Sequence, residues 1–450
     1  MNIHFIAIGG SAMHNLAIAL HQKGYQITGS DDTIHEPSKS RLEKYGLLPE
    51  QFGWFPEKVN VTLDAVILGM HAKQDNPELI KAQELGVKIY SYPEFLYEQS
   101  KHKTRVVIGG SHGKTTITSM ILHVLNYHDV KVDYMVGAQL EGFETMVHLT
   151  EENEFIVLEG DEYLSSPIDR RPKFHLYKPN IALISGIAWD HINVFPTFEN
   201  YVEQFSIFTN SLTNGGIMVY NEEDSEVKKV VEASEHSIKK YPYRTPGYTI
   251  ENGTTYIDTP DGAMPLEIFG KHNLQNLAGA KWICQHMGID EEDFYEAIAS
   301  FKGASKRLEK IAESSDTVVF KDFAHSPSKV KATTTAVKKQ YANKTLLACL
   351  ELHTYSSLNA EFLEEYEGTL SNADKAVVFY SPDAVKIKKL EEVTKDQIAK
   401  AFKREDLIIY THPEDFKNFL FNENLKNTAL LLMSSGNYGG LNFDEVKGLV

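Results

Sequence analysis

The stretch that decides the fold runs from Arg105 to Asn126 and reads RVVIGGSHGKTTITSMILHVLN. It begins with a β-rich run, continues through two glycines, and then shows apolar residues at helical spacing from Ile117 onward. Strand, glycine turn and helix in this order are typical of a phosphate-binding loop. One glycine of the usual pattern is missing, because Ile108 stands five positions before Gly113. An ordinary glycine-rich turn before a helix is therefore the alternative.

The residue types of this loop suit a triphosphate. Gly110 and Gly113 leave room for backbone N–H groups to face phosphate oxygens, and the helix N-terminus adds a partial positive charge. Lys114 can reach the terminal phosphates, and the Thr115 hydroxyl can coordinate Mg²⁺. The loop therefore predicts binding of ATP together with Mg²⁺.

Composition excludes several classes of protein. The chain has 450 residues, which is enough for about three domains. Its net charge of −17 argues against a protein that binds nucleic acids or anionic membranes in general. Two cysteines give no disulfide framework, and no apolar stretch approaches membrane-spanning length. The N-terminus lacks the features of a signal peptide, so we expect a soluble cytoplasmic protein without membrane insertion.

The N-terminal segment resembles a weakened dinucleotide-binding fingerprint. Ile3–Ile8 predicts a strand, Gly9-Gly10 a turn, and residues 12–23 a helix. Only the middle position of the three-glycine pattern is glycine, since Ala7 and Ala12 occupy the outer two. Asp31 and Asp32 follow about twenty residues later, where a ribose ligand is expected. A simple tight turn between strand and helix is the alternative.

Acidic residues and a histidine follow two predicted strands of the next segment. Phe155–Leu158 is followed by Glu159, which we expect to be a Mg²⁺ ligand beside the phosphate loop. For Asp161 and Glu162 a solvated acidic turn is an equal alternative. Strand 181–185 leads to His191, a possible metal ligand, although a single histidine is more often structural.

The rest of the chain predicts a small hairpin region and a further α/β domain. Residues 247–270 have turn signals at Asn252-Gly253 and Asp261-Gly262. After a junction at residues 303–309, strands and helices alternate, which predicts a parallel sheet with ligands at the carboxyl ends of its strands. We expect three α/β domains, at residues 1–102, 103–303 and 304–450. Strands are predicted at residues 317–320, 345–350, 376–380, 407–410 and 429–433.

Taken together, these motifs resemble those of the Mur ligases, the ATP-dependent amide-bond-forming family of peptidoglycan synthesis. The resemblance covers essentially the whole chain and implies a Rossmann-like N-terminal domain, a central P-loop ATPase-like domain and a Rossmann-like C-terminal domain. The motifs that carry it are GGSHGKTT at 109–116, VLEGDEY at 157–163, Asp190-His191, GKHNLQN at 270–276, KRLE at 306–309 and DFAHSP at 322–327.

Within this family the chain is similar to the branch that binds UDP-N-acetylmuramate directly, and two activities of that branch compete. One adds L-alanine. The other, that of the murein peptide ligases, attaches recycled L-Ala-γ-D-Glu-meso-diaminopimelate. DRRPKF at 169–174 and MSSGNYGG at 433–440 resemble the second group, so we expect the tripeptide ligase. A nucleotide-dependent switch without ligase activity is a further alternative from another class.

The resemblance also implies residue roles. Lys114, Glu159 and His191 are the expected catalytic residues, and Thr115, Glu159 and His191 the expected metal ligands. The ATP site would comprise Gly110, Ser111, His112, Gly113, Lys114, Thr115, Thr116, Asn273, Asn276, Arg307, Asp322 and His325. The UDP-sugar site would comprise Gly9, Gly10, Ser11, Ala12, Met13, Ser30, Asp31 and His71.

A compact basic group at Arg170, Arg171 and Lys173 has two equal interpretations. Either it recognises peptide carboxylates or the uridine diphosphate, or it is a solvated loop. Two departures from the family pattern affect other contacts. Ser326 stands where the family has a second histidine, and Glu351-Leu352-His353 replaces a turn richer in proline and arginine.

Overall fold

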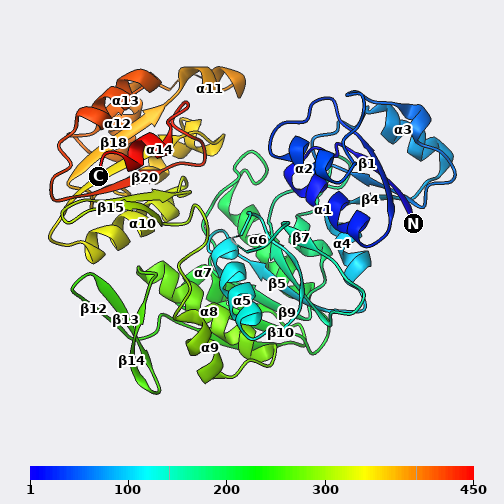
Figure 1. Cartoon of the computed structure of the whole chain (residues 1–450), viewed down its shortest axis with the longest axis horizontal. Helices are drawn as coiled ribbons and strands as arrows, with labels where there is room; N and C mark the ends of the chain where they lie inside the picture. Colours follow the sequence, from blue (N-terminus) through cyan, green and yellow to red (C-terminus); the bar gives the residue numbers. More distant parts are fainter. Residues whose placement is uncertain (141, 392) are drawn as a thin grey trace. The chain divides into compact units, whose positions relative to one another are not determined.

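The computed structural model describes residues 1–140, 142–391 and 393–450, and the chain divides into two compact units (Figure 1). The first unit comprises Met1–Ile187, Val202–Tyr243 and Trp282–Ile289, and the second comprises Ala188–Tyr201, Arg244–Lys281 and Asp290–Val450. Three open α/β sheets confirm the predicted α/β class with three domains. The exact domain boundaries at 102/103 and 303/304 stay a prediction.

The N-terminal sheet is parallel, with strand order β2-β1-β3-β4. Its central strand is buried on both faces, which explains the continuous apolar run at the start of the chain. The last helix begins at a capping box in which Ser91 and Glu94 bond each other's backbone, and it continues to Ser100, shortly before the predicted domain boundary at 102/103. The elements are β1 (Asn2–Ile6), α1 (Ser11–Gln22), β2 (Gln26–Ser30), α2 (Ser38–Lys44), η1 (Pro56–Lys58), β3 (Ala65–Leu68), α3 (Pro77–Leu85), β4 (Ile89–Ser91) and α4 (Tyr92–Ser100).

The central sheet has the order β11-β10-β9-β5-β8-β6-β7 and is parallel except for β7. Because β5 lies between β8 and β9, the segments that follow these three strands emerge at one edge of the sheet. Its elements are β5 (Thr104–Gly109), α5 (Lys114–Tyr127), β6 (Asp133–Met135), β7 (Val147–His148), β8 (Phe155–Gly160), η2 (Lys173–Leu176), β9 (Ile181–Ile184), α6 (Phe198–Asn210), β10 (Ile217–Asn221), α7 (Ser225–Ala233) and β11 (Lys239–Tyr243).

A separate three-stranded antiparallel sheet confirms the two predicted hairpins. The first turn lies at Asn252-Gly253, as predicted, and the second lies at Pro260-Asp261, one residue earlier than predicted, because Gly262 already pairs with Thr259. Asn252 and both glycines have positive φ, the backbone conformation that such tight turns require. The elements of this region are β12 (Tyr248–Glu251), β13 (Thr254–Thr259), β14 (Gly262–Leu266), α8 (Lys271–His286) and α9 (Glu291–Ile298).

The C-terminal sheet has the order β15-β16-β20-β17-β18-β19. Five strands are parallel, as predicted, but β15 pairs antiparallel with β16, and no strand was predicted at its residues. Edge strands with alternating charge, such as this one, lack a strong apolar signal. The elements are β15 (Glu309–Glu313), β16 (Val318–Asp322), α10 (Pro327–Gln340), β17 (Thr345–Leu352), η3 (Ser356–Leu358), η4 (Phe362–Tyr366), β18 (Lys375–Tyr380), α11 (Pro382–Ile387), α12 (Lys395–Phe402), β19 (Ile408–Tyr410), α13 (Pro413–Asn422), β20 (Thr428–Met433) and α14 (Phe443–Lys447).

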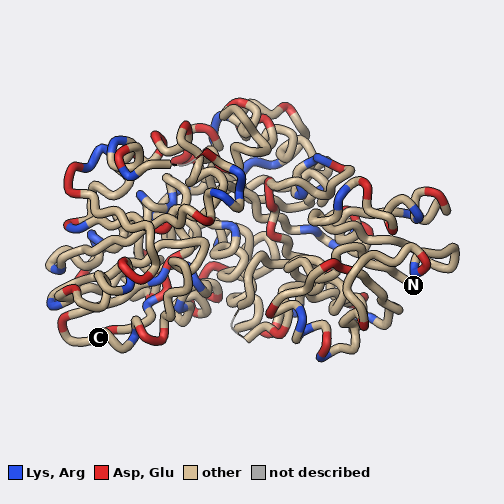
Figure 2. Tube along the Cα trace, turned by 90° about the horizontal axis from the view of Figure 1, so that it is seen from above, with Lys and Arg blue, Asp and Glu red and all other residues tan. Residues whose placement is uncertain are grey.

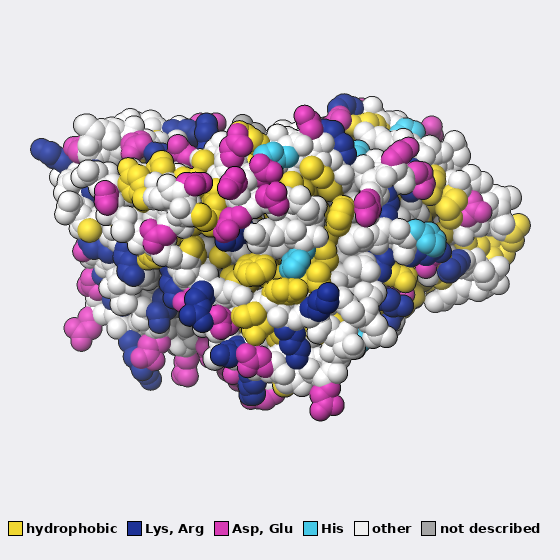
Figure 3. All heavy atoms as spheres, turned by 90° about the horizontal axis from the view of Figure 1, so that it is seen from below, with side chains coloured by type: hydrophobic (Ala, Val, Ile, Leu, Met, Phe, Trp, Pro, Cys, Tyr) yellow, Lys and Arg dark blue, Asp and Glu magenta, His cyan; other side chains and the backbone are white. Residues whose placement is uncertain are grey.

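The surface carries charges of both signs. Figure 2 shows acidic and basic residues interspersed along the whole trace, although acidic residues outnumber basic ones by 62 to 45. On the face drawn in Figure 3, apolar side chains come to the surface between charged ones. Among the described residues, no helix combines the length and the apolar character needed to cross a membrane.

Candidate active site

The predicted phosphate loop joins β5 to α5 as the sequence indicated. Gly110 has φ 132° and Gly113 has φ 78°, a region that side chains strongly disfavour. A Cβ on Gly110 would lie 2.1 Å from the Ser185 hydroxyl oxygen, so only glycine fits. The Ser111 N–H donates to the Gly186 carbonyl at 2.9 Å, which ties the loop to the end of β9. The turn is thus fixed from both sides.

Lys114, the first residue of α5, points its ammonium back at its own loop. It donates to the Gly110 carbonyl at 2.7 Å and to the Glu162 carboxylate at 2.7 Å. Burial acts to lower the pKa of Lys114, but the nearby carboxylates of Glu162, Asp161 and Glu159 outweigh it and raise the pKa above its usual value. The lysine therefore remains a cation at neutral pH.

Glu159 and Thr115, the two predicted Mg²⁺ ligands of this unit, lie together. The Thr115 hydroxyl donates to Glu159 at 2.7 Å, and the Gly137 N–H donates to the other carboxylate oxygen at 2.6 Å. Burial raises the pKa of Glu159, and Asp161 adds to that rise, while Thr115, Gly137 and Lys114 oppose it. A carboxylate and a hydroxyl are hard oxygen ligands that suit Mg²⁺ completed by phosphates and water. No cluster of three or more His, Cys, Asp or Glu side chains suited to a metal occurs among the described residues.

A closed hairpin, residues 161–174, follows β8 directly. The Lys173 N–H donates to the Tyr163 carbonyl at 2.9 Å, and the Phe174 N–H donates to the Asp161 carbonyl at 3.1 Å. Glu162 is 2% exposed. The alternative of a solvated acidic turn is therefore wrong for Glu162, because the hairpin folds this carboxylate inward onto Lys114.

The basic group of this hairpin is largely neutralised within the protein. Arg171 pairs with Asp169 at 2.6 Å and with Glu94 of α4 at 3.3 Å, and Lys173 pairs with Asp161 at 3.0 Å. Arg170 is exposed and has no ion pair among the described residues. Of the three predicted peptide-binding cations, Arg170 is thus the one whose charge is available to a ligand.

The N-terminal glycine turn is organised by Asp31. The Asp31 carboxylate accepts the Gly9 N–H at 2.7 Å, and a Cβ on Gly9 would lie 2.9 Å from the same oxygen. Burial raises the pKa of Asp31, although this hydrogen bond opposes the rise. The other predicted UDP-sugar residues flank this turn or follow neighbouring strands: Gly10, Ser11, Ala12 and Met13 after β1, Ser30 at the end of β2, and His71 after β3, where its side chain is exposed.

The second unit holds the remaining predicted ATP-site residues. Asp322 ends β16 and accepts the Thr333 hydroxyl at 2.6 Å. The Arg307 guanidinium lies 4.4 Å from the centre of the Phe323 ring. Asn273 and Asn276 lie buried near the start of α8, and the Asn273 amide donates to the Phe269 carbonyl at 2.9 Å. These roles in binding ATP stay predictions.

His191 and His325 belong to one charged cluster of the second unit. The Asp190 carboxylate accepts the His191 N–H at 2.8 Å and lies 3.8 Å from the Lys329 ammonium. Burial, with Lys329 nearby, lowers the pKa of His325 to about 4, although Asp190 opposes the shift. Burial acts to raise the pKa of Asp190, but Lys329, His191 and His325 outweigh it and lower the pKa. The role of His191 as a metal ligand stays a prediction.

Comparison with known proteins decides the family. A model of the Mur ligase middle domain matches residues 108–284, and a model of the Mur ligase family catalytic domain matches residues 2–104. A UDP-N-acetylmuramate–L-alanine ligase of Sulfurihydrogenibium sp. is 31% identical over 445 residues, which cover 96% of this chain and 94% of the relative. The chain belongs to the Mur ligase family. A second L-alanine ligase, from Persephonella marina, is 30% identical and covers 97% of this chain and 94% of that protein.

Solved structures of Mur ligases share this fold. A UDP-N-acetylmuramate–alanine ligase from Thermotoga maritima superposes with a TM-score of 0.70 at 20% identity and covers 97% of this chain and 96% of that one. A murein peptide ligase from Psychrobacter arcticus has a TM-score of 0.67 at 21% identity and covers 100% of this chain and 98% of that one. The predicted ligase class is confirmed, since Mur ligases are ATP-dependent and form amide bonds.

The sequence did not predict several residues that contact the site of this Mur ligase. Gly137 and Ser185 contact the predicted site, but neither stands in a motif that the sequence singled out. Tyr92 is buried, and burial together with the charges of Asp161 and Glu159 raises its pKa. No motif marks these three positions, because their contacts with the site form only on folding. Tyr177, in contrast, follows the DRRPKF stretch that resembles the murein peptide ligases; it is buried, and its hydroxyl has no hydrogen-bond partner within the described protein.

Proposed function

We propose that this protein is an ATP-dependent ligase that activates the carboxylate of UDP-N-acetylmuramate as an acyl phosphate and joins it to an amino acid or peptide through an amide bond. One observation supports this most directly: the phosphate loop carries two adjacent polar contacts. Lys114 donates to Glu162, and the Thr115 hydroxyl donates to Glu159. Both lie at the carboxyl end of neighbouring parallel strands, the usual ligand-binding edge of such a sheet.

The proposed roles follow from charge and position. Loop N–H groups and Lys114 hold the β- and γ-phosphates in line with the attacking carboxylate, because phosphoryl transfer depends on positioning and charge neutralisation. A carboxylate oxygen bonds to the γ-phosphorus, the bond from this phosphorus to the bridging oxygen breaks, and ADP leaves. Thr115 and Glu159 would hold Mg²⁺, which neutralises phosphate charge when bound. The acceptor's free amine then attacks the acyl carbon, an amide C–N bond forms, the C–O bond to phosphate breaks, and inorganic phosphate leaves.

L-Alanine is the acceptor that the comparisons favour. The relatives that are about 30% identical over nearly the whole chain are UDP-N-acetylmuramate–L-alanine ligases. The predicted preference for the tripeptide L-Ala-γ-D-Glu-meso-diaminopimelate is therefore the second candidate. One observation favours it: Arg170 in the hairpin of residues 161–174 is exposed and has no ion pair among the described residues, and a peptide with several carboxylates offers partners that L-alanine lacks.

Phosphate release and mass spectrometry of the product separate these readings. Purified protein is supplied with UDP-N-acetylmuramate, ATP and Mg²⁺, and then with L-alanine, with the tripeptide, or with no acceptor. We expect acceptor-dependent phosphate release and an amide product with one of the two acceptors. Phosphate release without any amide product would favour the nucleotide-dependent switch, and absence of both would contradict the ligase proposal.

A further inference from the structure

The Lys114–Glu162 contact has a feature that the phosphate-loop motif does not require. Three carboxylates lie at the end of β8 or directly after it, and each has a different partner: Glu159 has Thr115 and Gly137, Asp161 has Lys173, and Glu162 has Lys114. The carboxylate assigned to the lysine is thus distinct from the predicted Mg²⁺ ligand. The side chains of Lys114 and Glu162 are only 12% and 3% exposed, so the pair is shielded from water.

The geometry leaves the lysine able to bind phosphate without giving up either contact. An ammonium group has three N–H donors. Lys114 uses one on the Gly110 carbonyl and one on Glu162, both at 2.7 Å. The third has no protein partner among the described residues, so a phosphate oxygen can accept it while the other two bonds persist.

Glu162 is itself held firmly. Backbone hydrogen bonds from Lys173 and Phe174 to Tyr163 and Asp161 close the hairpin on both sides of it. The far part of the hairpin is tied to the N-terminal domain, where Gln74 donates to the Pro167 carbonyl at 2.9 Å. Because these contacts fix the backbone around Glu162, its carboxylate can hold the Lys114 ammonium in a defined position.

We propose that Glu162 is a positioning residue, which holds the Lys114 ammonium at the mouth of the phosphate loop so that its remaining N–H meets the phosphate that is transferred. This inference rests on the proposed ligase function. A preorganised donor stabilises charge that develops in the transition state, so its loss reduces turnover more than it weakens binding of ATP.

The test compares Glu162→Gln and Glu162→Asp with the natural protein. The Gln variant keeps the shape but loses the charge, and we expect kcat to fall about 10- to 100-fold while KM for ATP changes less than about threefold. The Asp variant keeps the charge on a shorter side chain, so its kcat should lie between the other two. A kcat of the Gln variant within twofold of the natural protein would overturn the proposal.

Asp133→Asn is the matched control. Asp133 forms the buried pair with Lys103 in the same domain at 3.0 Å, so its variant tests the loss of a buried charge alone. We expect reduced stability of the Asn variant with kcat unchanged. If kcat fell as far in Asp133→Asn as in Glu162→Gln, loss of any buried charge would explain the result. Glu162 would then have only a structural role, which would contradict the proposal.

A crystal structure of the Glu162→Ala variant provides a readout that does not depend on ligase activity. The Lys114 ammonium should leave its position on the Gly110 carbonyl, and an unmoved ammonium would contradict the proposal. If the natural protein forms no amide with either acceptor, the proposed function fails, while this structure still decides whether Glu162 positions Lys114.

Discussion

Two buried lysine–carboxylate pairs lie at opposite edges of the central sheet. Lys103 precedes β5 and meets Asp133, the first residue of β6, at the amino edge. Lys114 meets Glu162 at the carboxyl edge, after β5 and β8. The N···O distances are 3.0 Å and 2.7 Å, and both pairs are mostly shielded from water.

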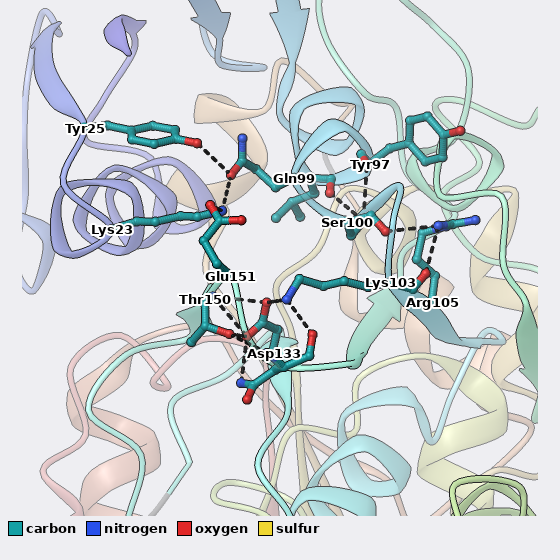
Figure 4. Close-up of polar contacts among 12 residues, drawn as sticks. Lys23, Tyr25, Tyr97, Gln99, Ser100, Lys103, Arg105, Asp133, Thr150 and Glu151 are labelled. Atoms are coloured by element: carbon teal, nitrogen blue, oxygen red, sulfur yellow. Dashed lines mark hydrogen bonds and ion pairs between the residues drawn. The ribbon is translucent and has the colours of Figure 1, made fainter.

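Both partners of the Lys103–Asp133 pair form further hydrogen bonds within the same domain. The Asp133 carboxylate also accepts the Thr150 N–H, the Thr150 hydroxyl at 2.8 Å and the Asn153 amide at 2.9 Å, and Figure 4 shows Thr150 and Lys103 turned toward it. The Lys103 ammonium also donates to the Asn153 carbonyl at 2.6 Å. Lys114 likewise has two partners among the described residues, the Gly110 carbonyl and Glu162. Position therefore separates the two pairs: Lys114 lies at the phosphate loop, on the edge of the sheet where ligands bind, whereas Lys103 and Asp133 lie at the opposite edge.

The largest expected effect comes from Lys114→Ala. Amide formation should fall at least about 10³-fold, because the charge on the transferred phosphate loses its nearest cation. Product formation by mass spectrometry checks this. The double variant Lys114→Ala/Glu162→Gln, which leaves no unpaired buried carboxylate, should be equally inactive, and normal turnover in either would exclude the phosphate-loop role.

Asp133→Ala should instead act on stability. Leaving Lys103 buried without its carboxylate costs about 3–5 kcal/mol. Urea denaturation should show a lower midpoint, whereas kcat of the folded fraction stays unchanged. A stable variant with reduced kcat would reverse the assignment of the two pairs.

Glu159→Gln tests whether Glu159, which lies close to Lys114 and Glu162, is a Mg²⁺ ligand. Loss of a ligand charge should raise the Mg²⁺ concentration needed for half-maximal rate about 10- to 100-fold, because the remaining Thr115 hydroxyl is a weak ligand. Titration of activity with Mg²⁺ at saturating ATP measures this. An unchanged Mg²⁺ dependence would remove Glu159 from the set of metal ligands.

Glu151→Ala should have the smallest effect. Glu151 pairs with Lys23 at 2.8 Å, but its side chain is 76% exposed. The free energy of unfolding should change by no more than about 0.5 kcal/mol, because ion pairs with a solvent-exposed partner contribute little. The Lys23 side chain is 7% exposed, but its ammonium keeps its hydrogen bond to Gln99 at 2.9 Å. A loss comparable to that of Asp133→Ala would mean that burial of the carboxylate does not decide how much such a pair contributes to stability.

Local sequence patterns predicted much of the fold. The phosphate loop, the two hairpins and the parallel C-terminal strands follow from glycine turns and apolar periodicity, and they lie where predicted. β15 was not predicted, because its residues EKIAE lack a sustained apolar pattern. The sequence suggested a solvated turn for Glu162 as readily as a site, since an acidic residue after a strand has the same local signature in both cases.

The sequence by itself determined the chemical type of the protein: residues 110–116 and Glu159 predict phosphate chemistry, and the family confirms an ATP-dependent ligase. Only the tertiary structure decided the pairing of charges. Lys114 and Glu162 are 48 residues apart, and Arg171 and Lys173 find their carboxylates through the folded hairpin. Which carboxylate neutralises which cation depends on distances set by strand register and burial, and these are properties of the folded chain.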